Sequence, residues 1–277
     1  MKTLSRRDFL KTAAIISALG LAGCGNPGQQ ENSGDGDSEA LKFDGNFIVG
    51  FDQEFPPYGF IGDDGEPCGF DLDLAAAVCE MKGWTYTPNP IDWNAKDGLL
   101  NSGAITCIWN GFTIEGRESD YAFTDAYMNN SNVVVVAADS DIQTLADLTD
   151  KNVVVQTDSG AQSILEGEQA DLAATFASLQ TIGEYNTAFM MLEQGTYDAI
   201  AVDEPVAHFN IEGKEDVFRI LEEPLNSEHY GVGFALGNEE LAAEVQAAMQ
   251  ELDANGTVEA TCEKYGLDYA NWCLPKA

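Results

Sequence analysis

Charged side chains stand at the ends of predicted strands, where they are placed to bind a ligand. Asp52 follows the apolar run Phe47–Phe51, and Asp203 ends the run Ala199–Asp203. Arg117 follows a further apolar stretch and can offer a planar pair of donors to a carboxylate. An acid at a strand end can pair with a cation. These residue types favour binding of a small molecule with charges of both signs.

Aromatic residues gather in the turn after the first apolar run, in the sequence Val49-Gly-Phe-Asp-Gln-Glu-Phe-Pro-Pro-Tyr-Gly-Phe60. The turn contains Phe55, Tyr58 and Phe60 and is interrupted by Pro and Gly. An open α/β sheet binds its ligand at the carboxyl ends of its strands, so these rings are predicted to line a ligand site. The alternative is that they fold back onto the core.

A helix is predicted from about Asp71. The Asp71 carboxylate is placed to cap the first turn, and Asp73 is assigned to the same role. Leu74, Ala77 and Val78 then fall on one helical face. The acids of this segment are therefore interpreted as structural.

Strands alternate with helices along the rest of the chain, which predicts an α/β class with parallel βα units. Further strands are predicted at Trp84–Thr87, Ile105–Trp109, Asn132–Ala138, Asn152–Gln156, Thr175–Leu179, Val217–Leu221 and Tyr230–Leu236. Helices are predicted at Trp93–Asn101, Ser159–Gln169, Gly183–Gln194, Pro205–Ile211, Glu239–Ala254 and Val258–Tyr265, with Trp93 in the core.

The composition excludes several partners. The chain has 47 acidic and 13 basic residues, a formal charge of −34. No basic stripe is left to neutralise phosphates, so neither nucleic-acid binding nor adhesion to an anionic membrane is expected. No Cys/His spacing resembles a zinc site, and no metal or cofactor is expected. Cys262 and Cys273 are close enough in sequence to form a bridge in an oxidising compartment.

The first residues are typical of an export signal. Arg6-Arg7 precedes an apolar run that is too short to span a bilayer. The following Leu21-Ala-Gly-Cys24 resembles the lipobox of bacterial lipoproteins. By that resemblance, residues 1–23 are a cleaved signal peptide and Cys24 carries a lipid. Residues 24–41 are rich in Gly, Ser, Asn and Asp and are predicted to be a flexible linker.

Five segments, in order, resemble the extracytoplasmic solute-binding proteins of polar-amino-acid ABC transporters. These segments are the aromatic turn with Gly69-Phe-Asp-Leu-Asp-Leu74, Asn110-Gly-Phe-Thr-Ile-Glu-Gly-Arg117, Val153-Val-Val-Gln-Thr-Asp-Ser-Gly160, Tyr197-Asp-Ala-Ile-Ala-Val-Asp203, and Asn255 to Gly266. The likeness runs from about Phe47 to the C-terminus.

The resemblance implies how one free amino acid is held. Arg117 would bind the α-carboxylate together with Thr113, and Asp203 would bind the α-ammonium. Asp52 would either assist Asp203 or reach the ligand's side chain. The complete predicted ligand-binding set is Asp52, Phe55, Tyr58, Trp109, Asn110, Gly111, Thr113, Arg117, Ser159, Gly160 and Asp203.

Each charged candidate also has a structural interpretation. Arg117 could pair with Glu115 or another surface acid. Ser159 could be a plain N-cap. Asp203 could cap the next helix, in which Pro205 would occupy an early position. The ligand-binding interpretation is preferred because the candidates lie at strand ends in both halves of the chain.

The resemblance further implies two α/β lobes of the type II periplasmic-binding-protein fold, joined by two crossings near Met128–Val133 and Asn226–Gly231. The first lobe is predicted at residues 42–129 and 230–277, and the second at 130–229. The protein would be a lipid-anchored, extracytoplasmic monomer that closes on a free amino acid and delivers it to an ABC permease. A dehydratase-like enzyme and an amino-acid-sensing domain remain alternatives, and which amino acid is bound stays open.

Overall fold

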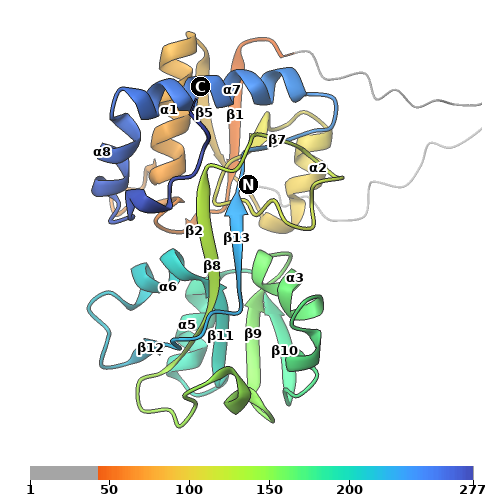
Figure 1. The fold of residues 1–277 in the computed structure, drawn as a ribbon, viewed down its shortest axis with the longest axis vertical. Helices are drawn as coiled ribbons and strands as arrows, with labels where there is room; N and C mark the ends of the chain where they lie inside the picture. The colour runs from red at the N-terminus through yellow and green to blue at the C-terminus, as the bar shows by residue number, and fades with distance from the viewer. Residues whose placement is uncertain (1–42, 277) are drawn as a thin grey trace, which may run out of the picture. The chain divides into compact units, whose positions relative to one another are not determined.

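The computed structural model describes residues 43–276. Two sheets, each with helices packed against it, form the α/β body, so the predicted class is confirmed (Figure 1). We call the first sheet with its helices the first lobe, and the second sheet with its helices the second lobe.

The first sheet has the strand order β5-β1-β6-β14-β7. β1, β5 and β6 are parallel, whereas β14 is antiparallel to both of its neighbours. Its strands are β1 (Asn46–Phe51), β5 (Thr85–Pro90), β6 (Cys107–Ile108), β7 (Ala122–Phe123) and β14 (Gly233–Phe234). The aromatic turn forms a small separate sheet of β2 (Glu54–Phe55), β3 (Gly59–Ile61) and β4 (Pro67–Cys68).

The second sheet has the order β10-β9-β11-β8-β12, and β13 also pairs with β8. β9, β10 and β11 are parallel, and β8 is antiparallel to β11. Its strands are β8 (Met128–Ala137), β9 (Asn152–Gln156), β10 (Ser178–Ile182), β11 (Ala199–Asp203), β12 (Phe218–Ile220) and β13 (Asn226–Tyr230). The parallel order brings the carboxyl ends of β9 and β11 to one edge, which faces the first lobe.

Helices cover both sheets (Figure 1). Those with the first sheet are α1 (Phe70–Lys82), α2 (Lys96–Asn101), α7 (Glu239–Ala254) and α8 (Thr257–Lys264), with short helices η1 (Trp93–Ala95) and η3 (Tyr269–Asn271). Those with the second sheet are α3 (Gly160–Glu166), α4 (Ala170–Ala173), α5 (Tyr185–Glu193) and α6 (Glu204–Ile211), with the short helix η2 (Leu145–Leu148).

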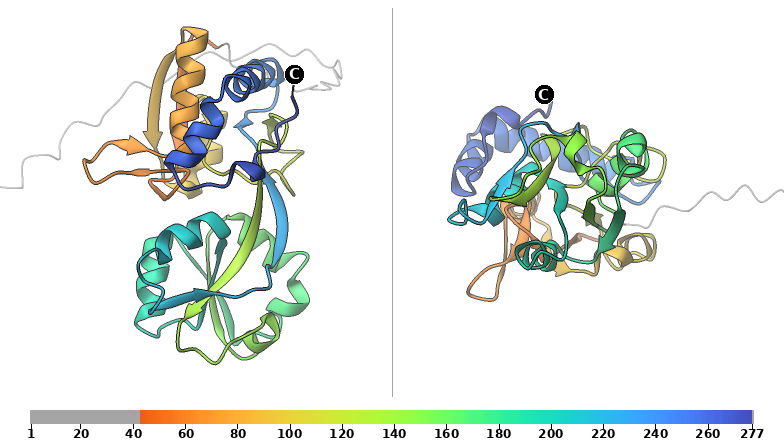
Figure 2. Two further views of the ribbon diagram at one scale, coloured as in Figure 1. Left: turned by 60° about the vertical axis from the view of Figure 1, so that its left-hand side comes forward. Right: turned by 90° about the horizontal axis from the view of Figure 1, so that it is seen from below.

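The first half of β8 and the whole of β13 form the connection between the lobes (Figures 1 and 2). Asn132 pairs with Asn226 and Met128 pairs with Tyr230 in antiparallel register. Beyond Asn132, β8 continues into the second sheet beside β11. The exact residue limits of the lobes remain a prediction.

The run of four valines in β8 is buried on both faces. Val133 and Val135 belong to one hydrophobic cluster, whereas Val134 and Val136 belong to another. Helices on both sides of the sheet exclude water from both faces, so the strand shows no alternation of apolar and polar residues. The predicted strand at Asn132–Ala138 is therefore real but begins four residues earlier.

The strand predicted at Tyr230–Leu236 is interrupted. β13 ends at Tyr230, and β14 contains only Gly233 and Phe234. Between them the chain changes partner: the Gly231 N–H donates to the Phe112 carbonyl, and the Val232 N–H donates to the Thr124 hydroxyl. The apolar pattern could not reveal this change of partner.

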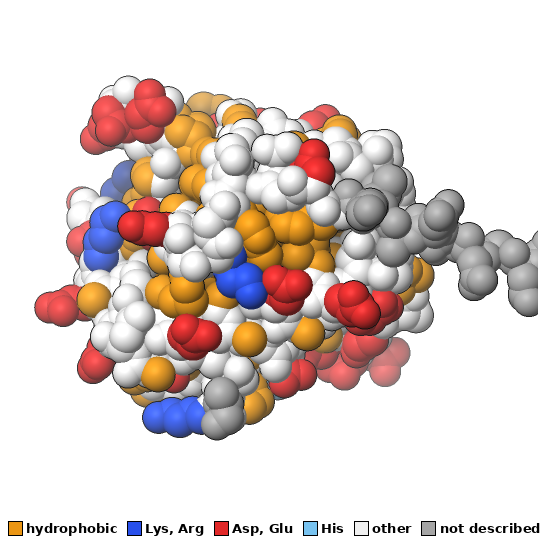
Figure 3. Space-filling view, turned by 90° about the horizontal axis from the view of Figure 1, so that it is seen from above, with side chains coloured by type: hydrophobic (Ala, Val, Ile, Leu, Met, Phe, Trp, Pro, Cys, Tyr) orange, Lys and Arg blue, Asp and Glu red, His pale blue; other side chains and the backbone are white. Residues whose placement is uncertain are grey.

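The surface carries the acidic excess. Outside the grey residues, Figure 3 shows Asp and Glu side chains spread over the first lobe, with few Lys and Arg side chains. None of the helices between residues 43 and 276 combines the length and hydropathy needed to cross a membrane.

Candidate functional site

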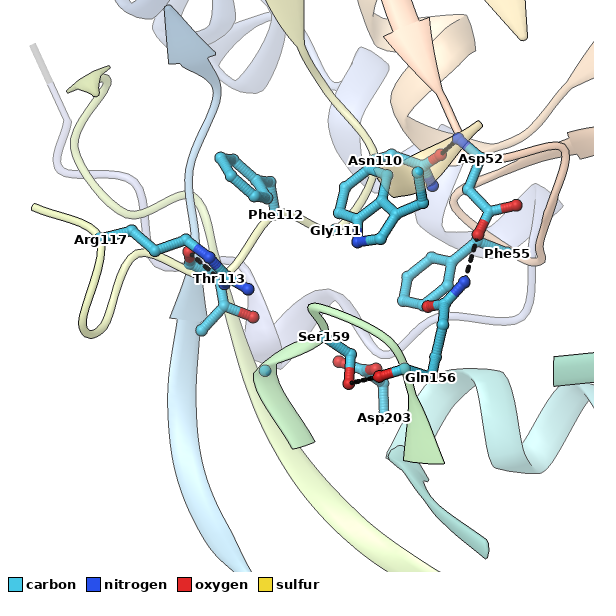
Figure 4. A pocket seen from close by; sticks show the side chains of 12 residues that line it. Asp52, Phe55, Asn110, Gly111, Phe112, Thr113, Arg117, Gln156, Ser159 and Asp203 are labelled. Atoms are coloured by element: carbon cyan, nitrogen blue, oxygen red, sulfur yellow. Dashed lines mark hydrogen bonds between the residues drawn. The ribbon is translucent and has the colours of Figure 1, made fainter. Parts of the chain in front are cut away.

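A cavity lies where the strand ends of the two lobes meet (Figure 4). It is lined by Asp52, Phe55, Trp93, Asn110, Gly111, Phe112, Thr113, Arg117, Gln156, Ser159, Gly160 and Asp203. Nine of these residues belong to the predicted ligand-binding set. The cavity draws on loops after β1 and β6 in the first lobe and on the ends of β9 and β11 in the second.

Arg117 is buried at one end of the cavity, with only 9% of its surface exposed. Its guanidinium donates to the carbonyl of Thr113 at 3.1 Å and to the carbonyl of Asp158 at 3.0 Å. It also stacks over the Phe112 ring, 5.0 Å from the centroid. Arg117 takes part in none of the ion pairs between described residues. Glu115, which was considered as its partner, pairs with His229. The surface-pair interpretation is therefore wrong.

The turn that presents Arg117 is tight. The Arg117 N–H donates to the Ile114 carbonyl at 2.9 Å, and Gly116 adopts a positive φ of 80°. A glycine reaches this conformation without steric cost. The turn folds the guanidinium back over Thr113, so both residues reach the same cavity.

Asp203 is 3% exposed and lines the cavity from the second lobe. The Tyr230 hydroxyl donates to its carboxylate at 2.5 Å and the Asn130 amide at 2.8 Å. Burial, followed by the negative charge of Glu228, raises the pKa of Asp203 to about 7. Asp203 does stand at the N-cap of α6, but its side chain makes no capping bond. Its carboxylate is thus free to serve the cavity.

Ser159 fulfils the capping role that was its alternative. Its hydroxyl accepts from the Gln162 N–H at 3.1 Å and donates to the Gln156 carbonyl at 2.8 Å. Ser159 and the following Gly160 both line the cavity. The cap thus fixes the start of α3 against the site.

Asp52 lies at the opposite side of the cavity from Arg117 (Figure 4). Its carboxylate accepts from the Gln156 amide of the second lobe at 2.6 Å and from the Glu54 N–H at 2.9 Å. Burial is the main cause that raises the pKa of Asp52. Asn110 accepts from the Asp52 N–H at 2.5 Å and so links the loops after β1 and β6.

Tyr58 and Trp109 do not line the cavity, although both were predicted as its walls. Both are fully buried. Tyr58 packs edge-on against Tyr230 with centroids 5.1 Å apart, beneath the residue that donates to Asp203. For Tyr58, the alternative that the aromatic turn folds back onto the core holds.

Asp71 does not cap α1. The helix begins at Phe70 with Gly69 at the N-cap and no side-chain cap. Asp71 is instead fully buried and accepts from the Gly111 N–H at 2.6 Å and from the Tyr127 hydroxyl at 2.8 and 2.9 Å. Burial raises its pKa to about 7. The acid therefore anchors a loop beneath the site.

Sequence reasoning missed the contacts that cross the cavity through Asp158. The Asp158 carbonyl accepts from the Trp93 indole N–H at 3.2 Å as well as from Arg117, and its carboxylate pairs with Lys96. Trp93 was assigned to the core, but it is only half-buried, and its ring lies 5.7 Å from that of Phe112 at the cavity wall. Gln156 could have been found, since it ends a correctly predicted strand.

The described residues offer no metal site and no disulfide. No group of three or more His, Cys, Asp or Glu side chains between residues 43 and 276 is arranged to hold a metal ion. Cys262 and Cys273 are free thiols, so the bridge considered for them is not formed. Cys24 lies outside the described residues.

Comparison with known proteins identifies the family. The family described as "Bacterial extracellular solute-binding proteins, family 3" matches residues 47–268. The glutamate-binding protein GluB of Corynebacterium glutamicum is 27% identical, over 91% of this chain and 89% of that protein.

Solved structures agree in fold. The substrate-binding protein of an ABC uptake transporter from Streptococcus pneumoniae, solved with bound histidine, is 30% identical with a TM-score of 0.77, covering 80% of this chain and 92% of that one. The ancestral amino-acid-binding protein AncCDT-1, described as a precursor of cyclohexadienyl dehydratase, is 26% identical with a TM-score of 0.72, covering 80% and 95%.

Proposed function

Since the chain belongs to the bacterial extracellular solute-binding proteins, family 3, we propose that its cavity captures one free amino acid for delivery to an ABC importer. One observation carries the proposal. Arg117 and Asp203, two buried side chains of opposite charge, line the same cavity from different lobes, and neither has an oppositely charged partner among the described residues.

The two ends of an amino acid match these two residues. Its α-carboxylate would accept hydrogen bonds from the guanidinium N–H groups of Arg117, which form strong, directional bonds to carboxylates. Its α-ammonium would pair with Asp203. A dissociation constant near 1 μM corresponds to about −8 kcal/mol, which two desolvated charge pairs can supply.

Binding would be coupled to closure. Arg117 and Trp93 of the first lobe reach the Asp158 carbonyl of the second, and Asp52 reaches Gln156. A ligand that bridges the same lobes adds to these contacts only in the closed form, so it shifts the equilibrium toward closure. An importer that recognises the closed form would then distinguish loaded from empty protein.

The test is calorimetry with the common amino acids, on the natural protein and on Arg117→Ala. We expect one or more amino acids to bind and Arg117→Ala to weaken binding on the order of 10²–10³-fold, because truncating one partner of a buried charge pair costs about 2–5 kcal/mol. Arg219→Ala is the matched control. Its guanidinium donates to the carbonyls of Ser140 and Ile142 outside the cavity, so affinity should be retained. Equal affinity in the natural protein and Arg117→Ala would contradict the proposal.

We extend the proposal to the segment outside the described residues. Export through the signal that contains Arg6-Arg7 and lipid attachment at Cys24 would leave the binding body on the linker of residues 24–41, outside the cytoplasm. Cys24→Ser should then release the protein from the membrane fraction. Retention of this variant on membranes would argue against the lipid anchor.

An enzyme on the same scaffold is the alternative, because a carboxyl with a pKa near 7, as at Asp203, also suits a general acid. Binding is preferred because the Asp203 carboxylate is held by Tyr230 and Asn130 at the end of the cavity where an ammonium would sit. Recovery of the bound amino acid unchanged after long incubation is expected. Conversion to another compound would favour the enzyme.

A further inference from the structure

Glu228 is a buried acid next to the cavity that the amino-acid site does not yet explain. It lies on β13 and is 1% exposed. One carboxylate oxygen accepts from the Thr113 hydroxyl at 3.0 Å and from the Asn130 amide at 2.8 Å. The other accepts from the Asn132 amide at 2.7 Å and the Asn226 amide at 3.3 Å. Four donors thus surround this carboxylate.

Glu228 and Asp203 form a pair of acids without a protein cation. The Asn130 amide nitrogen donates to both, at 2.8 Å each. Neither acid takes part in an ion pair between described residues. Two buried like charges are unfavourable unless a positive charge joins them or one takes a proton. A cation bound at this end of the cavity would therefore reduce the repulsion between the two acids.

Glu228 lies directly behind the cavity wall. Thr113 and Gly160, which line the cavity from the two lobes, both approach it. A methyl group added at Gly160 would come within 2.9 Å of one Glu228 oxygen and within 2.7 Å of the Thr113 hydroxyl oxygen. A ligand at Asp203 would therefore experience the Glu228 charge without touching it.

We propose that Glu228 is a positioning residue for the ammonium end: it holds Thr113 and Asn130 in place and adds negative charge behind Asp203, so that the cavity selects α-ammonium acids over α-hydroxy acids of the same shape. This inference rests on the proposed amino-acid function. An α-hydroxy acid has the same carboxylate for Arg117 but brings no positive charge to the acid pair.

Proton release provides an independent signature. The titratable groups facing Asp203 are Glu228 and Tyr230 of β13, Tyr58 of the aromatic turn, Tyr185 of α5, and Glu204 beside it in α6, with Arg117 across the cavity. Burial raises the pKa of all three tyrosines well above 10, so they stay neutral. Burial and the charge of Glu228 raise the pKa of Asp203 to about 7, so the pair of acids holds a proton at lower pH before an ammonium binds. An arriving ammonium should expel it.

The first experiment compares amino and hydroxy acids. The probes are L-glutamate, L-glutamine, L-histidine and L-arginine and, for the one that binds most tightly, the α-hydroxy acid with the same side chain. In Glu228→Gln the preference for the amino acid should fall about tenfold, as expected for loss of one neighbouring charge. The pH below which affinity declines should also move to a lower value.

Two variants serve as controls. Glu228→Asp retains the charge and should keep the preference within about threefold of the natural protein. Glu244→Gln removes an exposed acid that pairs with Lys82 outside the cavity, and it should change neither the preference nor the pH profile. A merely structural Glu228 would make Glu228→Gln and Glu228→Asp weaken both ligands equally.

The second experiment needs no variant. Calorimetry of the natural protein in buffers of different ionisation enthalpy should show release approaching about one proton per ligand at pH 6, and less at pH 8. No proton release at either pH, or an unchanged preference in a folded Glu228→Gln, would overturn the role of Glu228. Failure of every common amino acid to bind would instead overturn the proposed function.

Discussion

Asp71 and Asp203 are two buried acids whose pKa burial raises to about the same value, near 7. Asp71 is enclosed in the first lobe by the Gly111 N–H and the Tyr127 hydroxyl, and it lines no part of the cavity. Asp203 lines the cavity and has a second acid, Glu228, behind it. A raised pKa therefore does not distinguish a functional acid from a structural one.

The groups that surround Asp71 and Asp203 do distinguish the two acids. Two hydrogen-bond donors fixed by the fold satisfy the Asp71 carboxylate, and none of its described hydrogen-bond partners is a second acid. Asp203 also has two donors, but the adjoining charge of Glu228 is unbalanced until a cation arrives. In this molecule the like charge beside Asp203 at the cavity wall, and not burial, separates the two acids.

The largest difference expected between the two acids concerns ligand binding. Asp203→Asn should weaken amino-acid binding on the order of 10²-fold, because the ammonium loses its charged partner. Asp71→Asn, which retains an acceptor for Gly111, should change affinity by less than about threefold. Calorimetry on both variants gives the comparison. Equal losses would mean that the distinction between them is wrong.

Closure provides the next test. Gly160→Ala should weaken binding on the order of 10- to 100-fold, since overpacking costs about 1–3 kcal/mol and the added Cβ clashes with the Thr113 hydroxyl, which the first lobe brings against α3 on closure. Gly98→Ala is the control, because a Cβ at Gly98 meets nothing within 4 Å. Calorimetry measures affinity, and small-angle scattering with ligand should show Gly160→Ala staying more open. Normal closure of this variant would contradict the contact.

Asp71 should instead affect how the free energy of unfolding depends on pH. Burial raises its pKa from the ordinary 3.8 of an aspartate to about 7, so the unfolded chain loses the proton first as pH rises. The contribution of Asp71 to stability is therefore greatest at low pH and declines between about pH 4 and pH 7. Relative to Asp71→Asn, the natural protein should lose on the order of 2 kcal/mol between pH 5 and pH 7. Urea unfolding at each pH measures this difference, and parallel profiles would refute it.

The smallest expected effect concerns Trp93. Trp93→Phe keeps a ring against Phe112 but removes the donor to the Asp158 carbonyl. Loss of one such hydrogen bond, about 1 kcal/mol, should weaken ligand binding about fivefold. Trp84→Phe, at a half-buried ring that stacks on Phe47 outside the cavity, is a control for removal of an indole and should leave affinity unchanged. A Trp93→Phe variant with full affinity would show that this contact is not needed for closure.

The elements that position the site could largely be predicted from the sequence. Short apolar runs with clear ends located β9 and β11, and apolar residues at helical spacing located α7, at their observed bounds. Chain position relative to these strand ends was enough to bring Asp203 and Ser159 to one cavity. Such signals are local, so a single sequence contains them.

The remaining features depend on contacts between distant segments. Nothing near Asp71 indicates that Tyr127 and Gly111 will enclose it, and so it was assigned to a helix cap. Glu228 lies within the predicted crossing near Asn226–Gly231, but its pairing with Asp203 follows from the register of β8 and β13. Burial and pairing of this kind become visible only in three dimensions.

The most direct test of the central claim is a crystal structure with a bound amino acid. We expect its α-carboxylate to lie within hydrogen-bond distance of the Arg117 guanidinium and its α-ammonium to contact the Asp203 carboxylate, in the cavity that both residues line. A ligand held elsewhere, or one oriented with its ammonium toward Arg117, would contradict the account.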